Sequence, residues 1–145
     1  MSQQRLHNAL RRLGDALHKA ERLNAVDNAL SVSQLRVLSQ LGEADEALTV
    51  TELAQKQCLA LSTMTRNVDV LIRRGWVSKV TGTADKRTVN ITLTENGQSL
   101  REKIEATNLA LLNRAFRNVH PSERVERAAA LNRVAASLEE VTRSA

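Results

Sequence analysis

The sequence predicts a mainly α-helical fold with one small β-hairpin. Apolar residues recur at three- and four-residue steps over most of the 145 residues, as they do on one face of a helix. Residues 76–80 and 89–93 are the two expected strands, and 89–93 alternates apolar and polar residues in the manner of a half-buried strand. The chain has a single proline and no glycine- or serine-rich linker, so we expect one domain over residues 1–145.

The first helix is expected from about Gln3 to about Asn28. Its apolar residues form a narrow stripe bordered by charged residues, which is typical of a helix that packs on another helix. We therefore expect residues 1–29 to be shared with a second copy of the chain. The alternative is an amphipathic helix that covers its own domain. The stripe comprises Leu6, Leu10, Leu13, Leu17, Ala20 and Leu23.

Two capping boxes predict the starts of the next helices. In a capping box a Ser or Thr side chain accepts a bond from the backbone three residues on, and a Glu or Gln there returns one. Ser31 and Gln34 fit this pattern for a helix that ends near Gly42. Thr49 and Glu52 fit it for a shorter helix.

A further helix is expected between Ser62, a suitable N-cap, and Gly75, which favours the left-handed end of a helix. Placing one residue every 100° puts apolar residues on one side and short polar or basic residues on the other. The apolar side comprises Leu61, Met64, Val68, Leu71, Ile72 and Gly75.

The polar side of this helix suits the major groove of duplex DNA. Small side chains allow close approach to base edges, and guanidinium groups bind guanine or phosphate. Arg66 is the first candidate, whereas Arg73 and Arg74 could instead compensate the helix dipole. The candidate DNA contacts on the helix are Ser62, Thr63, Thr65, Arg66, Asn67, Arg73 and Arg74.

The two predicted strands flank a basic loop at residues 81–88. Its Lys86 and Arg87 are candidate DNA contacts, because cations on such a loop can enter a minor groove or bind a phosphate. Two helices, a turn and this hairpin make a winged helix-turn-helix, a module that binds duplex DNA. We place this DNA-binding lobe at residues 30–94.

Two more helices are expected after the hairpin. Thr94 can cap a long helix, and Pro121 marks a break and a fresh helix start. Both helices again carry narrow apolar stripes. Stripes at both ends of the chain imply that residues 1–29 and 95–145 form a helical dimerisation region.

Three segments, R-R-G-W-V at 73–77, D-K-R at 85–87 and I-T-L-T-E-N-G at 91–97, together resemble the MarR family of bacterial transcription regulators. The resemblance implies an intertwined homodimer that binds a pseudo-palindromic operator. It also implies a repressor released by a small-molecule effector, often an aromatic acid or a phenolic compound. Asp85, in the D-x-R pattern, is then a residue that orients the wing by pairing with an arginine.

Composition favours a polyanionic partner. The net charge is +5 and the pI is about 10.1, and between residues 62 and 90 the cations outnumber the two carboxylates. Aromatic residues make up only 1%, which argues against a stacking platform for single-stranded nucleic acid. No apolar window approaches the length of a membrane span and the N-terminus does not resemble a signal peptide, so we expect a cytoplasmic protein.

Cys58 is the only cysteine, so an intrachain disulfide is impossible. We interpret Cys58 as a small packing residue near the helix-turn-helix turn, with a thiol-based redox switch as the alternative. A winged-helix module used only for protein contacts is a second alternative, disfavoured by the cations. No catalytic motif, metal-ligand spacing or cofactor signature is present, so we expect no enzyme, no metal ion and no cofactor.

Overall fold

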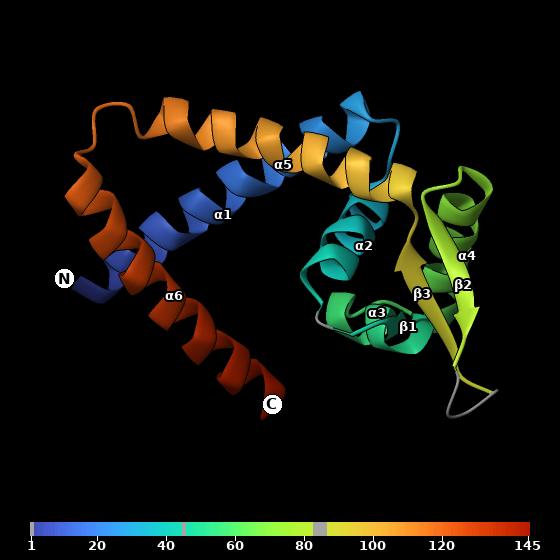
Figure 1. The fold of residues 1–145 in the computed structure, drawn as a ribbon. Coiled ribbons are helices and arrows are strands. Elements are labelled where there is room, and N and C mark those ends of the chain that lie inside the picture. Colours follow the sequence, from blue (N-terminus) through green and yellow to red (C-terminus); the bar gives the residue numbers. More distant parts are fainter. Residues whose placement is uncertain (1, 45, 83–86) are drawn as a thin grey trace. The chain divides into compact units, whose positions relative to one another are not determined.

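The computed structural model describes residues 2–44, 46–82 and 87–145 (Figure 1). The chain divides into two compact units, Met1–Glu105 and Ala106–Ala145. The predicted mainly α fold is confirmed. Its elements are α1 (Ser2–Asp27), α2 (Val32–Glu43), β1 (Leu48–Thr49), α3 (Val50–Gln57), α4 (Leu61–Arg73), β2 (Val77–Thr81), β3 (Val89–Leu93), α5 (Glu95–Ala115) and α6 (Pro121–Arg143).

The sheet has three antiparallel strands in the order β1-β3-β2. In the predicted hairpin, Val77 pairs with Leu93 and Thr81 with Val89. The additional strand, β1, places Leu48 opposite Ile91. The sequence did not predict it, because two residues are too few to display an alternating pattern.

The first unit has a closed apolar core made by α2, α3, α4 and the sheet. Figure 1 shows the β2–β3 hairpin beside these three helices, and contacts join α4 to β2 and α2 to β3. Full burial of one such side chain contributes about 1.5–3 kcal/mol. The largest fully buried side chains are Leu38, Leu53, Met64, Leu71, Ile91, Val37, Val68 and Val77.

Both predicted capping boxes are confirmed. Ser31 Oγ accepts from the Gln34 backbone N–H at 3.1 Å, and Gln34 Oε1 accepts from the Ser31 N–H at 3.0 Å. In the second box Glu52 Oε2 accepts from the Thr49 N–H at 2.7 Å. The starts of α2 and α3 are therefore set by local side-chain chemistry.

The predicted N-cap Ser62 is wrong. Helix α4 begins at Leu61, and its N-cap is Ala60, whose side chain makes no capping bond. Leu61 was predicted to lie on the apolar side but is 53% exposed. The reason is that the core beneath α4 starts at Met64, almost one helical turn later.

The junction between the hairpin and α5 is tightly packed. Gly75 has a φ of 76°, as predicted for a left-handed helix end. Thr94 Oγ1 donates to the Gly75 carbonyl oxygen at 2.6 Å and accepts from the Gly97 N–H at 3.0 Å, which confirms Thr94 as a cap. A Cβ at Gly97 would collide with the Trp76 carbonyl oxygen. The L-T-x-x-G pattern therefore has a steric cause.

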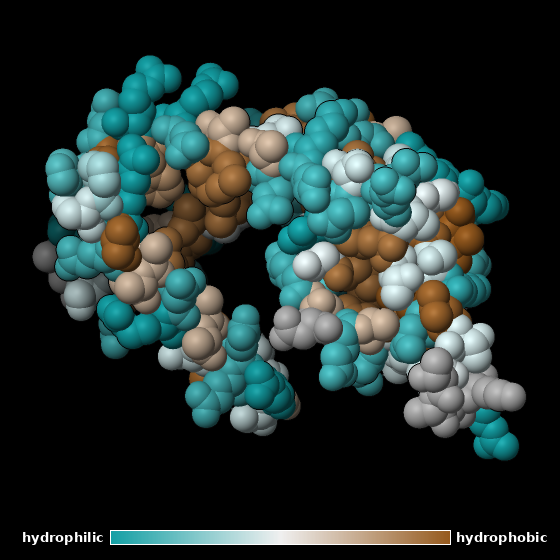
Figure 2. Space-filling model, viewed as in Figure 1, coloured by the Kyte–Doolittle hydropathy of each residue, from teal (hydrophilic) through white to brown (hydrophobic). Residues whose placement is uncertain are grey.

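The second unit contains the C-terminal part of α5 and all of α6. The helix start at Pro121 is confirmed, with His120 as N-cap. Arg124 holds the preceding turn, since its Nε donates to the Val119 carbonyl oxygen at 2.9 Å and its Nη2 to that of Phe116 at 2.6 Å. No residue of α6 is buried. In Figure 2 apolar side chains (brown) show at the surface between polar ones (teal).

Candidate nucleic-acid interface

Helix α4 has the two faces that its sequence predicts. Met64, Val68 and Leu71 are buried on one side. The other side is exposed and polar, and Thr65 Oγ1 donates to the Leu61 carbonyl oxygen at 2.9 Å, so its proton is used within the helix. The predicted DNA contacts on the exposed side are Ser62, Thr63, Thr65, Arg66 and Arg73.

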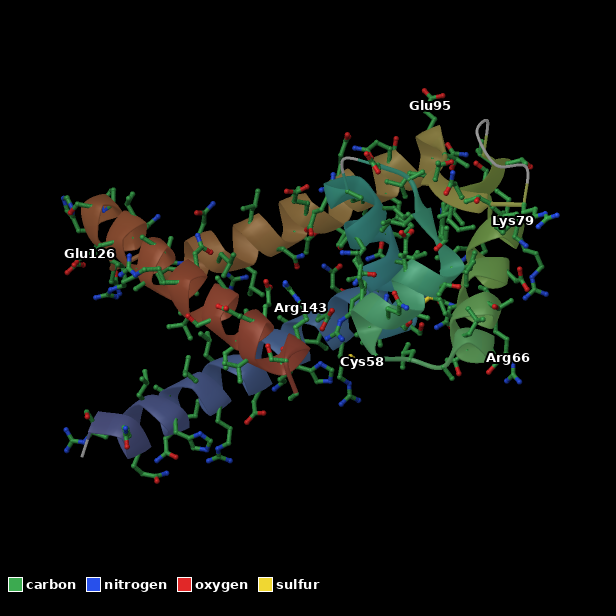
Figure 3. All side chains as sticks on the ribbon, turned by 90° about the horizontal axis from the view of Figure 1, so that it is seen from below. Cys58, Arg66, Lys79, Glu95, Glu126 and Arg143 are labelled. Carbon is green, nitrogen blue, oxygen red and sulfur yellow. The ribbon has the colours of Figure 1, made fainter. Side chains whose placement is uncertain are left out.

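A cation-lined hollow of about 630 Å³ lies against α4 and β2. Lys79 Nζ is 3.6 Å from Asp69 Oδ1 across it, and both side chains are about half exposed. Three cations against one carboxylate leave the hollow positive, so it attracts polyanions. In Figure 3 Arg66 and Lys79 project away from the protein on the same side. The hollow is lined by Arg66, Asp69, Val70, Ile72, Arg73 and Lys79.

Lys79 is a site residue that sequence reasoning did not single out. Side chains two residues apart lie on the same face of a strand, so Lys79 shares its face of β2 with Val77, but Val77 is buried and Lys79 is exposed. Its proximity to α4 could not be read from the pattern. That proximity depends on how β2 packs beside α4.

Asn67 and Arg74 already have partners in the free protein. Asn67 is half-buried, and its Nδ2 donates to Ser33 Oγ at 2.9 Å. Arg74 Nη1 donates to the Ala29 carbonyl oxygen at 2.5 Å. The Arg74 guanidinium also lies 3.8 Å from the centroid of the Trp76 ring, a cation–π geometry. Their roles as DNA contacts stay predictions.

Of the three residues predicted to act in the wing, Arg87 is among those that the structure describes. Asp85 and Lys86 lie outside the described residues. Arg87 is described and exposed. Close to it, the Gly82 N–H donates to the Thr88 carbonyl oxygen at 2.8 Å and extends the hairpin beyond β2.

Cys58 is exposed, so its interpretation as a packing residue is wrong. It is the C-cap of α3 in a left-handed conformation, with a φ of 52°. The chain turns there from α3 towards α4, which carries the side chain away from the core. Over residues 2–44, 46–82 and 87–145, no three His, Cys, Asp or Glu residues are grouped as a metal site. None of the helices described there is long and apolar enough to cross a membrane.

The chain is similar to known proteins in sequence and in structure. Residues 30–89 match the model of the MarR family. The chain is 31% identical to the HTH-type transcriptional repressor YetL of Bacillus subtilis (strain 168) over 96 residues, which cover 66% of this chain and 58% of YetL. The matched part is thus less than two thirds of that relative.

Solved structures extend the likeness over nearly the whole chain. A MarR family protein from Bacillus stearothermophilus has a TM-score of 0.85 at 27% identity, covering 95% of this chain and 96% of its own. A mutant of S. aureus MepR bound to an oligodeoxyribonucleotide has a TM-score of 0.65 at 18% identity, covering 92% and 97%. At that identity MepR shows only the fold. The family model, the relative and the fold agree in their likeness to the MarR family.

Proposed function

We propose that this protein is a transcription regulator that binds duplex DNA through the exposed side of α4. The observation that carries the proposal is the placement of Arg66, Arg73 and Lys79 around one positive hollow. Arg66 and Arg73 can form paired hydrogen bonds with a guanine edge or a phosphate, and Lys79 adds a point charge. MepR, which shares the fold, is bound to an oligodeoxyribonucleotide, which supports the same partner here.

The proposal assigns different tasks to the two ends of α4. Ser62 and Thr63 lie in the first turn and are exposed, so they can approach base edges closely. Arg73, in the last turn, suits a phosphate. Lys86 and Arg87 of the wing would bind the flanking backbone, and Asp85 would orient the wing.

We further propose that the active form is a homodimer. Isolated surface leucines need no explanation, but rows of them along helices mark an interaction surface. A two-fold dimer presents two copies of α4 to a pseudo-palindromic site. The supporting residues are exposed on α1, α5 and α6: Leu6, Leu13, Leu17, Leu23, Leu109, Leu111, Leu112, Val125, Leu131, Leu138 and Val141.

A repressor released by a small effector is the form of regulation that we propose. The relative YetL is a transcriptional repressor, which supports repression. The effector would be an aromatic acid or a phenolic compound that prefers a dimer whose recognition helices are wrongly spaced for DNA. Such a regulator acts in the cytoplasm, where the bacterial chromosome lies.

The test is fluorescence anisotropy with duplexes that the wild-type protein selects from a randomised pool. We expect Arg66→Ala to lower affinity for the selected duplex by about tenfold or more, because one bidentate base contact contributes about 1–3 kcal/mol. Arg143→Ala removes the same charge from α6, on the side opposite its exposed leucines, and serves as the matched control. Equal affinities for Arg66→Ala and wild type would exclude α4 as the reading helix. Failure of the wild type to select any sequence would favour a protein-contact module.

A thiol-responsive regulator is the second candidate, and the exposure of Cys58 in the turn before α4 favours it. Peroxide would then lower the DNA affinity of the wild type. Cys58→Ser should keep full affinity under the same treatment. If peroxide affects both proteins equally, Cys58 is not the sensor.

A further inference from the structure

Four half-buried polar side chains meet between α2, α3 and α4: Ser33, Gln40, Gln57 and Asn67, here called the Ser33 network. Ser33 Oγ donates to Gln57 Oε1 at 2.7 Å and accepts from Asn67 Nδ2 at 2.9 Å. Gln57 Nε2 donates to the Ser33 carbonyl oxygen at 3.2 Å and to Gln40 Oε1 at 3.1 Å. One serine thus joins the start of α2 to the end of α3 and the middle of α4.

The chemistry of the groups gives these bonds a single direction. An amide nitrogen only donates, and an amide oxygen only accepts. The one proton of the Ser33 hydroxyl is given to Gln57, so the hydroxyl oxygen accepts from Asn67. Hydrogen bonds arranged in such a chain polarise one another. Removal of the Ser33 hydroxyl therefore breaks the bond from Asn67 and one bond to Gln57, whose amide nitrogen keeps its bonds to the Ser33 carbonyl oxygen and to Gln40.

The Ser33 network constrains α4 in a way that its apolar side does not. Met64, Val68 and Leu71 hold α4 against the core, but apolar burial has no preferred direction and tolerates small rotations. A hydrogen bond loses strength when its angle changes. Asn67 directly follows Arg66, so a rotation of α4 that breaks the Asn67 bond also displaces the Arg66 side chain.

We propose that the Ser33 network sets the rotation of α4 and that Asn67 is a positioning residue which acts through Ser33 instead of contacting a base. This inference rests on the proposed DNA-binding function. It assigns the preference for one DNA sequence over another, and not the general affinity for DNA, to the polar side chains of the Ser33 network. Base contacts need accurate placement of the reading helix, whereas phosphate attraction depends mainly on charge.

The experiment measures discrimination, defined as the ratio of affinities for the selected duplex and a random duplex. We expect Ser33→Ala and Asn67→Ala each to lower this ratio about tenfold, which is the effect of roughly one or two hydrogen bonds. Affinity for the random duplex and its dependence on salt should not change, because no charge is altered. The double variant should lose no more than either single variant, since both break the same chain.

Matched variants separate positioning from general damage. Gln57→Ala should lose discrimination as Ser33→Ala does, whereas Gln55→Ala, an exposed glutamine of the same helix, should not. Ser33→Thr keeps the hydroxyl and should restore the ratio. Thermal unfolding identifies any variant that fails to fold, and Asn67→Ala then carries the test, because Asn67 lies on the partly exposed shoulder of α4.

Each contrary result has its own meaning. Additive losses in the double variant, with the Asn67 loss confined to one base pair, would make Asn67 a base contact and overturn the inference. Unchanged discrimination in Ser33→Ala would reduce the network to a structural role. A wild-type protein without any discrimination would instead overturn the proposed function, together with the inference that rests on it.

Discussion

Apolar residues are mostly buried in the helix-turn-helix part and mostly exposed on the terminal helices. Met64, Val68 and Leu71 of α4 are at most 1% exposed, because α2, α3 and the sheet cover them. On α6, Leu131, Leu138 and Val141 are at least 44% exposed. The same three- and four-residue spacing therefore produces a closed core in one region and an open stripe in the other. A helix pattern predicts that a face will be covered, but not by which chain.

The largest effect should come from the closed core. Leu71→Ala removes a fully buried side chain, and we expect the free energy of unfolding to fall by about 2–5 kcal/mol. Leu61→Ala is the control on the same helix, since Leu61 is 53% exposed, and it should change stability by less than about 0.5 kcal/mol. Urea unfolding at one protein concentration measures both. Equal losses of stability would contradict the difference in burial between Leu71 and Leu61.

A substitution in the open stripe should weaken dimer formation and leave the folding of the chain unchanged. Leu138→Glu places a charge on the exposed apolar row of α6, and we expect dimer dissociation to become easier by at least about tenfold. Ala136→Glu adds the same charge on the opposite side of the helix and should have little effect. Sedimentation of the two variants at micromolar concentration makes the comparison. A wild-type chain that sediments as a monomer would contradict the dimer proposal.

The junction at Gly97 tests how closely the lobe is held to α5. Gly97→Ala forces a Cβ against the Trp76 carbonyl oxygen, and we expect a loss of about 1–3 kcal/mol as the backbone moves apart. Gly14 of α1 has no atom within 4 Å of a built Cβ, so Gly14→Ala should instead stabilise its helix by up to about 1 kcal/mol. Thermal unfolding of the pair should give shifts of opposite sign. A stabilising Gly97→Ala would mean that the junction is loosely packed.

The sequence predicted those features that depend on neighbouring residues. Ser31, Thr49 and Thr94 are caps because each side chain bonds a backbone group a few residues away. Ser62 failed as a cap because the start of α4 depends on the extended backbone of Ala60, which leaves no signal in residue type. Strand β1 was missed because it exists only through its pairing with β3.

In the candidate site, too, the sequence predicted the features that depend on neighbouring residues and missed the contacts between distant ones. The exposed position of Arg66 follows from the helix pattern, and the structure agrees. The contact between Lys79 and Asp69 joins two elements, and the bond between Asn67 and Ser33 spans 34 residues. Such contacts depend on tertiary packing. A pattern can therefore place a side chain on the outer face of a helix, but it cannot show that an inner partner already holds that side chain.

The smallest effect is expected where α1, which carries one open stripe, is attached to the closed lobe. Arg36 Nε and Nη2 donate to the two oxygens of Glu21 at 2.6 and 2.8 Å, and the pKa of Arg36 is raised, chiefly by this hydrogen bond. Because Arg36 is 46% exposed, Glu21→Gln should cost no more than about 1 kcal/mol, and high salt should shrink the loss.

Glu105→Gln is the matched control for this attachment, since Glu105 pairs with Arg101 of its own helix at 3.6 Å and should contribute about 0.2–0.5 kcal/mol. Urea unfolding at low and high salt compares the two variants. A larger loss for Glu21→Gln than for Glu105→Gln would mean that the paired geometry between α1 and α2 adds to stability. Equal losses would mean that apolar packing attaches α1 to the lobe, and Ala25 is the buried apolar residue of that helix.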